Sequence, residues 1–251
     1  MIDRAVILAA GMGTRLRSVV DDRPKGLVEI HGETLVGRSV RLLRAAGIAE
    51  VTIVGGYLAE QYERFAAGES LVTIVRNDAF ATTGSMASLA VALDRVAGPL
   101  LVLESDIVYE LRALDALLRG DAEEATLLSG PTGAGDEVWV DASGGRLRAM
   151  SKNRGALAAV SGEFVGITRL SAAVCTTLRA EFQRFTSARG HARMDYETDG
   201  LVAAARTHPI AGTLIEDLCW GEIDDDRQLD RVTHLIWPSL IADKSGCGPV
   251  A

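Results

Sequence analysis

The chain has 251 residues, of which 48% are hydrophobic and 24% are charged, the profile of an ordinary globular protein. A chain of this length can bury roughly 70–75% of its unfolded surface, so it needs neither a disulfide nor a structural metal to hold its core. The formal net charge is −8 and no run of Lys and Arg stands out, which argues against nucleic acid as the main partner. An acidic protein still binds an anionic nucleotide where a few basic groups and a metal ion converge.

The three cysteines, Cys175, Cys219 and Cys247, lie far apart and are odd in number, which matches neither a disulfide framework nor a metal-ligand spacing. They are expected to be thiols in a reducing cytoplasm. The chain contains no apolar run of 18 residues that would cross a membrane, and its start lacks the features of a signal peptide. The sequence therefore predicts a cytoplasmic protein that does not bind membranes.

Short apolar runs that end at glycine or polar residues alternate with helical patterns in the first half. The runs predict strands buried on both faces, at Arg4–Ala10, Val51–Gly55, Leu71–Val75 and Leu100–Leu103. The helical spacing falls at Leu35–Ala46, Leu58–Ala67 and Ser85–Val96. Strand and helix alternating at this interval predict right-handed βαβ units and a mostly parallel sheet.

After about residue 125 the strands are separated by glycine-rich turns, which predicts a mixed, partly antiparallel part of the sheet. The expected strands are Ala125–Ser129, Glu137–Asp141, Arg146–Ser151, Phe164–Thr168 and Thr213–Glu216, with an extended segment at Cys219–Ile223. Helices are expected at Ala172–Phe185, at Glu197–Arg206 and from Asp226 onward. We predict one domain over residues 1–240 and a frayed tail over 241–251.

A glycine-rich loop, Gly11-Met12-Gly13-Thr14-Arg15, follows the first strand, at the edge of an α/β sheet where ligands bind. Its glycines allow backbone N–H groups to approach phosphate oxygens closely. The loop fits no dinucleotide fingerprint, because the position three after Gly13 is Leu16, and no Walker A loop is present. Arg15 and Arg17 supply positive charge, although a bare loop of this kind is also typical of a solvated surface turn.

The segment from Leu8 to Leu16, followed by Pro24-Lys25, resembles the signature of the sugar-phosphate nucleotidyltransferase superfamily, the MobA-like NTP transferases. The resemblance implies that Arg15 holds the leaving pyrophosphate and that Lys25 contacts phosphate. Such cations offset the repulsion between an anionic nucleophile and an anionic α-phosphate. It also implies that the nucleotide is held by Leu8, Ala10, Gly11, Met12, Gly13 and Thr14.

Two acidic segments become metal-site candidates through the same resemblance. Glu104-Ser105-Asp106 follows a predicted strand, and Trp220-Gly221-Glu222-Ile223-Asp224 matches a segment in which the family's aspartate completes a metal site. Alone, either segment is also explained as an acidic turn or a helix cap. With the resemblance, Asp106 and Asp224 are the expected Mg²⁺ ligands, and Glu104 belongs to the nucleotide site with a less defined role.

Further segments resemble the phosphocholine and phosphonate cytidylyltransferase branch. Met86 and Leu89 are expected to face the core, whereas the nucleotide contacts would come from Tyr57, Thr83, Gly84 and Ser88. Lys152 would contact the acceptor's phosphate or phosphonate. Acceptor-lining residues would be Glu163, Asp195, Tyr196, Glu197, Trp220 and Glu222. Asp195 is equally well explained as a helix cap.

The sequence thus predicts a Rossmann-like α/β nucleotidyltransferase that uses Mg²⁺, CTP and a small phosphonate or phosphate acceptor. The acceptor is left open between phosphonates, which Lys152 and Arg154 favour, and choline phosphate, which an aromatic or acidic cage would hold. None of the four histidines falls in a matched motif, in keeping with an acceptor that is already ionised. The alternatives are a sugar-1-phosphate nucleotidylyltransferase and a nucleotide sensor without turnover; a homodimer also remains open.

Overall fold

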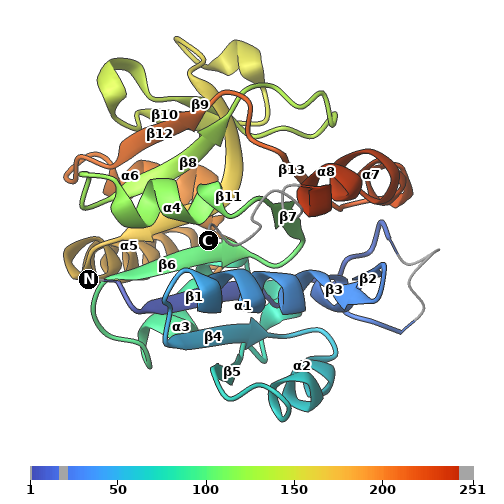
Figure 1. Ribbon diagram of the computed structural model, residues 1–251. Helices are drawn as coiled ribbons and strands as arrows, with labels where there is room; N and C mark the ends of the chain where they lie inside the picture. Colours follow the sequence, from blue (N-terminus) through green and yellow to red (C-terminus); the bar gives the residue numbers. More distant parts are fainter. Residues whose placement is uncertain (1, 17–21, 243–251) are drawn as a thin grey trace.

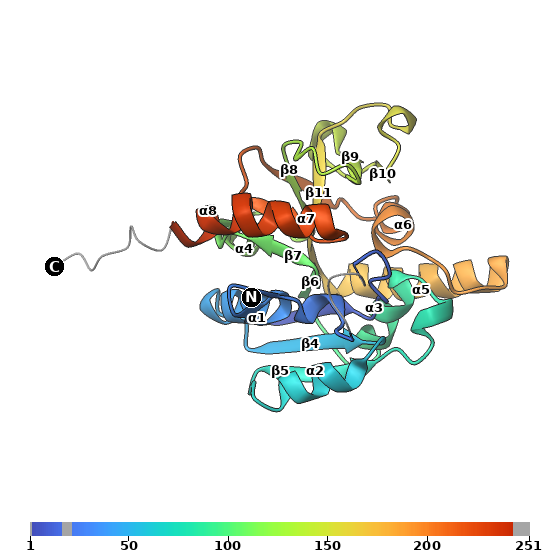
Figure 2. The same cartoon turned by 90° about the vertical axis from the view of Figure 1, so that its right-hand side faces the viewer.

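One nine-stranded mixed sheet forms the centre of the molecule, with helices on both of its faces (Figures 1 and 2). The computed structural model describes residues 2–16 and 22–242. The strand order is β10-β9-β11-β6-β1-β4-β5, with β8 paired to β11 and β12 paired to β8. The predicted fold class, a mixed and mostly parallel sheet flanked by helices, is confirmed.

The four apolar runs of the first half form the parallel strands, each within one residue of the predicted ends. They are β1 (Arg4–Ala9), β4 (Glu50–Gly55), β5 (Val72–Arg76) and β6 (Leu100–Glu104). Leu8 of β1 lies opposite Val54 on one side and Glu104 on the other. Because all three strands end at this level, the loops that follow them leave the sheet side by side, which is where parallel sheets bind ligands.

Strands of the second half extend the same sheet through β11 (Gly162–Leu170), which pairs antiparallel with β6. The others are β8 (Ala125–Ser129), β9 (Trp139–Asp141), β10 (Ala149–Ser151) and β12 (Ala211–Ile215). The register of β11 shifts between Phe164 and Thr168, and Gly166 there has a φ of +83°. A Cβ on Gly166 would lie 2.7 Å from Glu104 Oε2. Glycine at this irregular position therefore makes room for the Glu104 carboxylate.

Successive side chains of the central strands point to opposite faces of the sheet, which divides the core into two layers. Ala5 and Ile7 of β1 belong to one hydrophobic cluster and Val6 to the other, as the period of two in a strand requires. The first layer contains α1 (Leu35–Ala45), α2 (Ala59–Ala66) and α4 (Arg112–Arg119). The second contains α3 (Ser85–Leu93), α5 (Ala172–Arg189), a π-helical turn η5 (Tyr196–Leu201) and α6 (Val202–Ala204).

A smaller layer lies beside the carboxyl end of β6. There β7 (Ile107–Tyr109) pairs antiparallel with β13 (Trp220–Glu222), and a short hairpin joins β2 (Glu29–Ile30) to β3 (Glu33–Thr34). Three helices, drawn in red in Figure 1, cover this layer: α7 (Asp226–Arg231), the π-helical η6 (Val232–Ile236) and α8 (Trp237–Ala242). Their apolar side chains form a third core cluster with Leu16, Val28 and Ile223.

The structure adds elements that the sequence patterns did not predict, among them β7 and α4. It also moves helix ends: α3 stops at Leu93 rather than Val96, and α5 continues to Arg189 rather than stopping at Phe185. The final helix runs on to Ala242, two residues past the predicted domain limit. Residues 243–251, which carry the rest of the predicted tail and Cys247, lie outside the described residues. No helix within 2–16 and 22–242 is both long and apolar enough to cross a bilayer.

Candidate active site

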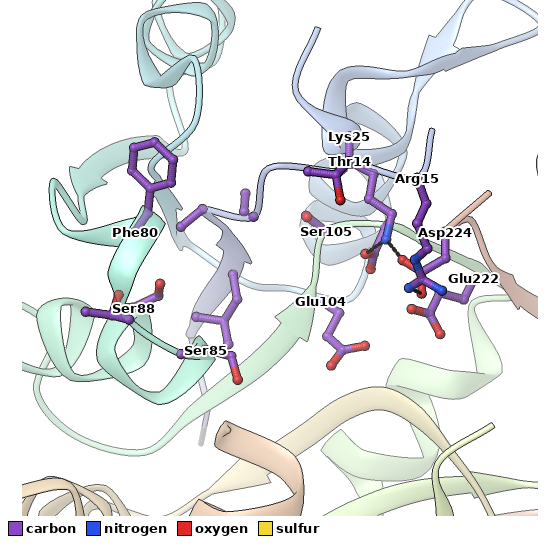
Figure 3. A pocket seen from close by; sticks show the side chains of 18 of the residues that line it. Thr14, Arg15, Lys25, Phe80, Ser85, Ser88, Glu104, Ser105, Glu222 and Asp224 are labelled. Atoms are coloured by element: carbon purple, nitrogen blue, oxygen red, sulfur yellow. Dashed lines mark hydrogen bonds and ion pairs between the residues drawn. The ribbon is translucent and has the colours of Figure 1, made fainter. Parts of the chain in front are cut away.

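A cavity of about 360 Å³ opens where β1 and β6 end (Figure 3). Most of the predicted catalytic, nucleotide and metal residues line it, as does the predicted acceptor residue Glu222. They are Leu8, Ala10, Gly11, Gly13, Thr14, Arg15, Lys25, Thr83, Gly84, Ser88, Glu104, Asp106 and Asp224. Figure 3 shows two ends, one with Arg15, Lys25 and Asp224, the other with Phe80 and Ser88. We call these the charged end and the neutral end.

Strand pairing explains how Asp106 and Asp224 meet although 118 positions separate them in the sequence. Ile107 of β7 lies opposite Glu222 of β13, and the backbone N–H of Ile223 donates to the carbonyl of Asp106 at 3.0 Å. Asp106 immediately precedes one strand and Asp224 closely follows the other. The antiparallel register therefore brings both carboxylates to the same end of the small sheet.

Cations bridge these carboxylates in the structure. Lys25 Nζ contacts both Asp106 Oδ2 and Asp224 Oδ1, and the Arg15 guanidinium contacts Asp224 Oδ2. The Lys25 side chain is only 12% exposed. Burial lowers its pKa, but the charges of Asp106 and Asp224 outweigh burial and raise the pKa overall, so Lys25 stays protonated. Arg17, the second predicted basic residue of the loop, lies outside the described residues.

Two glycines fix the position of Lys25. The residue begins a short helix η1 (Lys25–Leu27) directly after Pro24, whose fixed φ suits a helix start. A Cβ on Gly26 would lie 2.6 Å from Val36 Cγ2 and 2.7 Å from the hydroxyl of Tyr62, so only glycine fits. Gly13, with a φ of +55°, packs against the Lys25 side chain from the loop after β1. The two halves of the predicted motif are therefore in contact.

Two overlapping groups of carboxylates could hold a divalent cation. Glu104, Asp106 and Glu222 form one, and Asp136, Glu222 and Asp224 form the other, with their ligand oxygens within 4.8 Å of one another in each group. Asp106 Oδ1 is buried and has no hydrogen-bond partner among the described residues. A bare carboxylate oxygen among other carboxylates fits Mg²⁺, which takes oxygen ligands.

The electrostatics of this cluster are uneven. Burial, together with the neighbouring charges of Asp106 and Asp224, raises the pKa of Glu222 to about 9. Burial acts in the same direction on Asp224, but the charge and hydrogen bond of Lys25 outweigh it and lower that pKa to about 2. The protein alone therefore favours one protonated and one ionised carboxylate here. A bound divalent cation would favour the ionised form of both.

Phe80 dominates the neutral end. It belongs to a short helix η2 (Phe80–Thr82) that follows β5, and Thr83, Gly84 and Ser88 line the same part of the cavity. Tyr57, predicted to contact nucleotide, does not line the cavity; its ring packs edge-on against Phe80, with centroids 6.5 Å apart. Met12 is 40% exposed and also lies off the lining.

Of the predicted acceptor residues, Glu222 lines the cavity itself and Glu197 lies beside it. The Glu197 carboxylate accepts a hydrogen bond from Ser85, which lines the pocket, at 3.4 Å. Burial raises the pKa of Glu197, and the charge of Asp195 raises it further, while Lys152 acts in the opposite direction. Lys152 and Asp195 are exposed and neither lines the cavity. The Asp195 side chain makes no cap bond to the helix that follows it.

Three other acceptor predictions need correction, because burial removes the side chains from the cavity. Trp220 is 5% exposed, and its indole N–H donates to Ser129 Oγ at 2.8 Å. The Tyr196 ring is 1% exposed in the core between sheet and helices. Glu163 is 2% exposed and accepts hydrogen bonds from the backbone and hydroxyl of Thr132, at 2.8 and 2.9 Å. All three side chains are therefore enclosed by the fold, and those of Trp220 and Glu163 have their hydrogen-bond partners there.

Five further residues line the cavity that were not among the predicted site residues. These are Ala9, Tyr62, Phe80, Ser85 and Ser105. Phe80 follows the end of the predicted parallel strand at Val75 by five positions, which is a signal for a ligand site that could have been used. Asp136 also reaches the charged end, 3.7 Å from Arg15 and hydrogen-bonded to Gln228 at 2.6 Å. No sequence pattern marks that residue, because a long loop carries it to the cluster.

A glycine loop with cations after β1, facing carboxylates after β6 on this sheet, defines a Rossmann-like nucleotidyltransferase fold. Residues 5–194 match the family model of the MobA-like NTP transferase domain, and the chain belongs to that family.

Its relatives include enzymes named for cytidylyl transfer. The chain is 32% identical, over 90% of its length, to CMP-5'-(3-aminopropyl)phosphonate synthase of Streptomyces rubellomurinus. It is 29% identical over 50% of its length to choline-phosphate cytidylyltransferase of Streptococcus pneumoniae, and 31% identical over 41% to 2-aminoethylphosphonate cytidylyltransferase of Lancefieldella rimae. The alignments cover 38%, 52% and 43% of these proteins, so the chain spans about half of their length or less.

Solved structures share the fold. The inositol-1-phosphate CTP transferase from T. maritima superposes with a TM-score of 0.80 at 21% identity, over 99% of this chain and 98% of that one. The CTP:phosphocholine cytidylyltransferase from Streptococcus pneumoniae gives 0.73 at 20% identity, over 94% and 99%. At these identities the likeness concerns the architecture.

Proposed function

We propose that this chain is a Mg²⁺-dependent cytidylyltransferase that transfers CMP from CTP to a small phosphonate acceptor and releases pyrophosphate. The observation that carries the proposal is the charged end of the cavity, where Arg15 and Lys25 face Asp106 and Asp224 at the carboxyl end of the parallel strands. The names of the relatives supply the nucleotide and the class of acceptor.

Asp106 and Asp224 would hold the Mg²⁺, with Glu222 between them as the shared carboxylate. The ion would neutralise phosphate charge and act as a Lewis acid on the α-phosphate. The bare Oδ1 of Asp106 supports this assignment, because no protein group competes for it among the described residues. Glu104, in the neighbouring group, would border both the metal and the nucleotide.

Lys25 and Arg15 would supply the remaining positive charge. With Asp106 and Asp224 engaged by the metal, Lys25 Nζ and the Arg15 guanidinium would leave their ion pairs with these carboxylates. Both would then be available to bind phosphate oxygens, and Arg15, on the exposed glycine loop, would hold the leaving pyrophosphate. The backbone N–H groups of the loop from Gly11 would add neutral donors.

The transfer itself moves no proton. An ionised oxygen of the acceptor attacks the α-phosphorus of CTP and forms a P–O–P bond. The bond from that phosphorus to the oxygen bridging to the β-phosphate breaks, and pyrophosphate leaves with the electron pair. Because the nucleophile is already ionised near neutral pH, a general base is not needed. This agrees with a lining in which no histidine of the described chain takes part.

For the acceptor we propose an aminoalkylphosphonate. The half-buried carboxylates of Glu104 and Glu197 lie at the side of the cavity near Ser85, close enough that the charge of Glu197 adds to burial in raising the pKa of Glu104. Such a negative region favours an ammonium group. An aromatic cage for choline has less support, because the rings of Trp220 and Tyr196 are in the core. Lys152, exposed beside Asp195 and Glu197, is the cation that we assign to the phosphonate.

The test is release of pyrophosphate from each of the four NTPs, with Mg²⁺ and a panel of aminoalkylphosphonates, phosphonoformate, phosphocholine and sugar 1-phosphates. We expect release with CTP and an aminoalkylphosphonate, and its loss when the metal is chelated. Release only with sugar 1-phosphates would contradict the cytidylyltransferase assignment. Nucleotide binding without release in any combination would instead indicate a sensor.

A further inference from the structure

A buried amide lies behind the neutral end of the cavity. Asn77 follows β5 and is 4% exposed, and its backbone N–H donates to the carbonyl of Gly55 at 2.8 Å. Its side chain reaches two hydroxyl groups, on Thr83 before α3 and on Ser88 within it. Both hydroxyl residues line the cavity, whereas Asn77 does not.

The hydrogen bonds determine which way this amide faces. The Ala79 backbone N–H can only donate, and it lies 3.1 Å from Asn77 Oδ1, so this atom is the carbonyl oxygen. Nδ2 therefore faces the hydroxyls, at 3.1 Å from Thr83 Oγ1 and 3.0 Å from Ser88 Oγ. An amide nitrogen carries two protons, and these two contacts use both.

Donation from Asn77 fixes the polarity of each hydroxyl. Thr83 accepts from Asn77 and donates its own proton to the carbonyl of Ala79 at 3.1 Å. Ser88 also accepts from Asn77, but its proton has no acceptor among the residues that the structure describes. Ser88 is 4% exposed and lines the cavity close to Phe80, as Figure 3 shows. A ligand that binds at the neutral end of the cavity therefore meets the Ser88 hydroxyl as a hydrogen-bond donor.

We propose that Asn77 is a positioning residue that holds Ser88 as a donor toward the base, and that this polarity selects cytosine over uracil. Cytosine presents an unprotonated N3, which accepts a hydrogen bond, whereas uracil N3 carries a proton. With uracil, the Ser88 hydroxyl and the N3–H group would both be donors facing each other, and neither would find an acceptor. Burying such unsatisfied polar groups weakens binding. The inference rests on the proposed nucleotide transfer and adds the determinant of base choice.

Binding without an acceptor tests base choice separately from transfer. Calorimetry of the full chain with Mg²⁺ should give CTP a Kd about ten- to hundredfold lower than UTP, the range expected for one mismatched polar contact. Ser88→Ala should bring the two Kd values to within about threefold, chiefly by weakening CTP. The matched control is Thr82→Ala, since the Thr82 hydroxyl donates to the Ala79 carbonyl, its one partner in the described part of the chain, and Thr82 does not line the cavity. The control should keep the preference for CTP.

Two further measurements address Ser88 and Asn77 directly. The triphosphate of 3-deazacytidine, in which a C–H replaces N3, should bind wild-type protein about as weakly as UTP and should bind Ser88→Ala about as well as CTP does. In Asn77→Asp the new carboxylate accepts the Ser88 proton, so the preference should shift toward UTP by at least tenfold. Thermal unfolding checks that this variant folds. If it does not, binding to Ser88→Ala and binding of the 3-deaza analogue still test whether Ser88 donates to N3.

The outcomes separate the two proposals. If the wild-type chain binds no nucleoside triphosphate, the proposed transfer fails. If it transfers CMP but binds CTP and UTP equally, the transfer stands and the role of Ser88 and Asn77 is overturned. An unchanged preference for CTP in Ser88→Ala would overturn it as well.

Discussion

The two ends of the cavity are built in different ways. At the charged end, residues from distant parts of the chain, such as Lys25, Asp106 and Asp224, are held together by ion pairs. At the neutral end, Asn77, Thr83 and Ser88 lie within twelve positions of sequence and are held by neutral hydrogen bonds. In the proposed reaction the ion pairs would open to admit a metal and a phosphate, whereas the neutral network would keep its partners when a base binds.

This difference predicts a separation of roles. Substitutions at the charged end should lower the rate for every nucleotide, because charge develops on phosphate whichever base is attached. Substitutions at the neutral end should change the ratio between nucleotides. Each prediction below tests whether the two ends can be separated in this way.

The largest effect is expected for Asp224→Asn. The substitution removes a charge that contacts both Lys25 and Arg15 and would hold Mg²⁺, so CMP transfer should fall by about 10³-fold or more, about 4 kcal/mol of transition-state stabilisation. The matched control is Asp225→Asn, because Asp225 caps α7 through the backbone N–H of Gln228 and asparagine caps equally well. Initial rates and thermal unfolding would be measured for both; full activity in Asp224→Asn would refute the metal assignment.

Lys25→Met should lower the rate by about 100-fold, to the same extent with CTP and with UTP. It keeps much of the side-chain volume that Gly13 packs against but removes the charge. It also leaves Asp106 without its cation, so the metal-free variant should unfold at a lower temperature and regain stability when Mg²⁺ is added. Steady-state kinetics with both nucleotides check this. If the substitution changed only the ratio of the rate with CTP to the rate with UTP, the proposed separation of roles between the two ends would be contradicted.

Glu222→Gln should change how stability depends on pH. The pKa of Glu222 is raised to about 9 in the fold, so its neutral form contributes stability that is full below about pH 4.5 and lost as the pH rises toward 9. Glutamine keeps the neutral shape at every pH. In the presence of a chelator the variant should therefore match wild type near pH 5 and melt several degrees higher at pH 8. The same difference in melting temperature between variant and wild type at both pH values would contradict the raised pKa.

The smallest effect is expected for Trp220→Phe. The indole is buried and bonded to Ser129, away from the cavity, so the KM for the acceptor should stay within about twofold of wild type. The lost hydrogen bond should cost about 1 kcal/mol of stability, seen as a lower melting temperature. Acceptor titrations check the KM. A large rise in the KM for phosphocholine alone would support the hypothesis of an aromatic cage that includes Trp220.

Local patterns in the sequence were enough for the parallel half of the fold. Apolar runs fixed the ends of β1, β4, β5 and β6 to within a residue, because a strand buried on both faces leaves a continuous apolar signal. The three-residue strand β7 is too short to leave one, although its pairing with β13 is what joins Asp106 to Asp224.

The candidate site divides along similar lines. Arg15, Lys25, Asp106 and Asp224 were predicted together only through the resemblance, and the structure brings them into one cluster. Motif matches did not distinguish a side chain that lines a cavity from one that supports it, which is why Trp220, Tyr196 and Glu163 were misplaced. Asn77 is hydrogen-bonded to Ser88, and Asp136 to Gln228. No spacing of residues in the sequence predicts these contacts.

The most direct test of CMP transfer is phosphorus NMR of the chain incubated with CTP, Mg²⁺ and 2-aminoethylphosphonate. We predict that the three resonances of CTP are replaced by that of pyrophosphate and by a coupled pair from a new P–O–P linkage between the phosphonate and CMP, and that Asp224→Asn produces neither. Formation of CDP and orthophosphate, or an unchanged CTP spectrum with every phosphonate and phosphate acceptor tried, would contradict it.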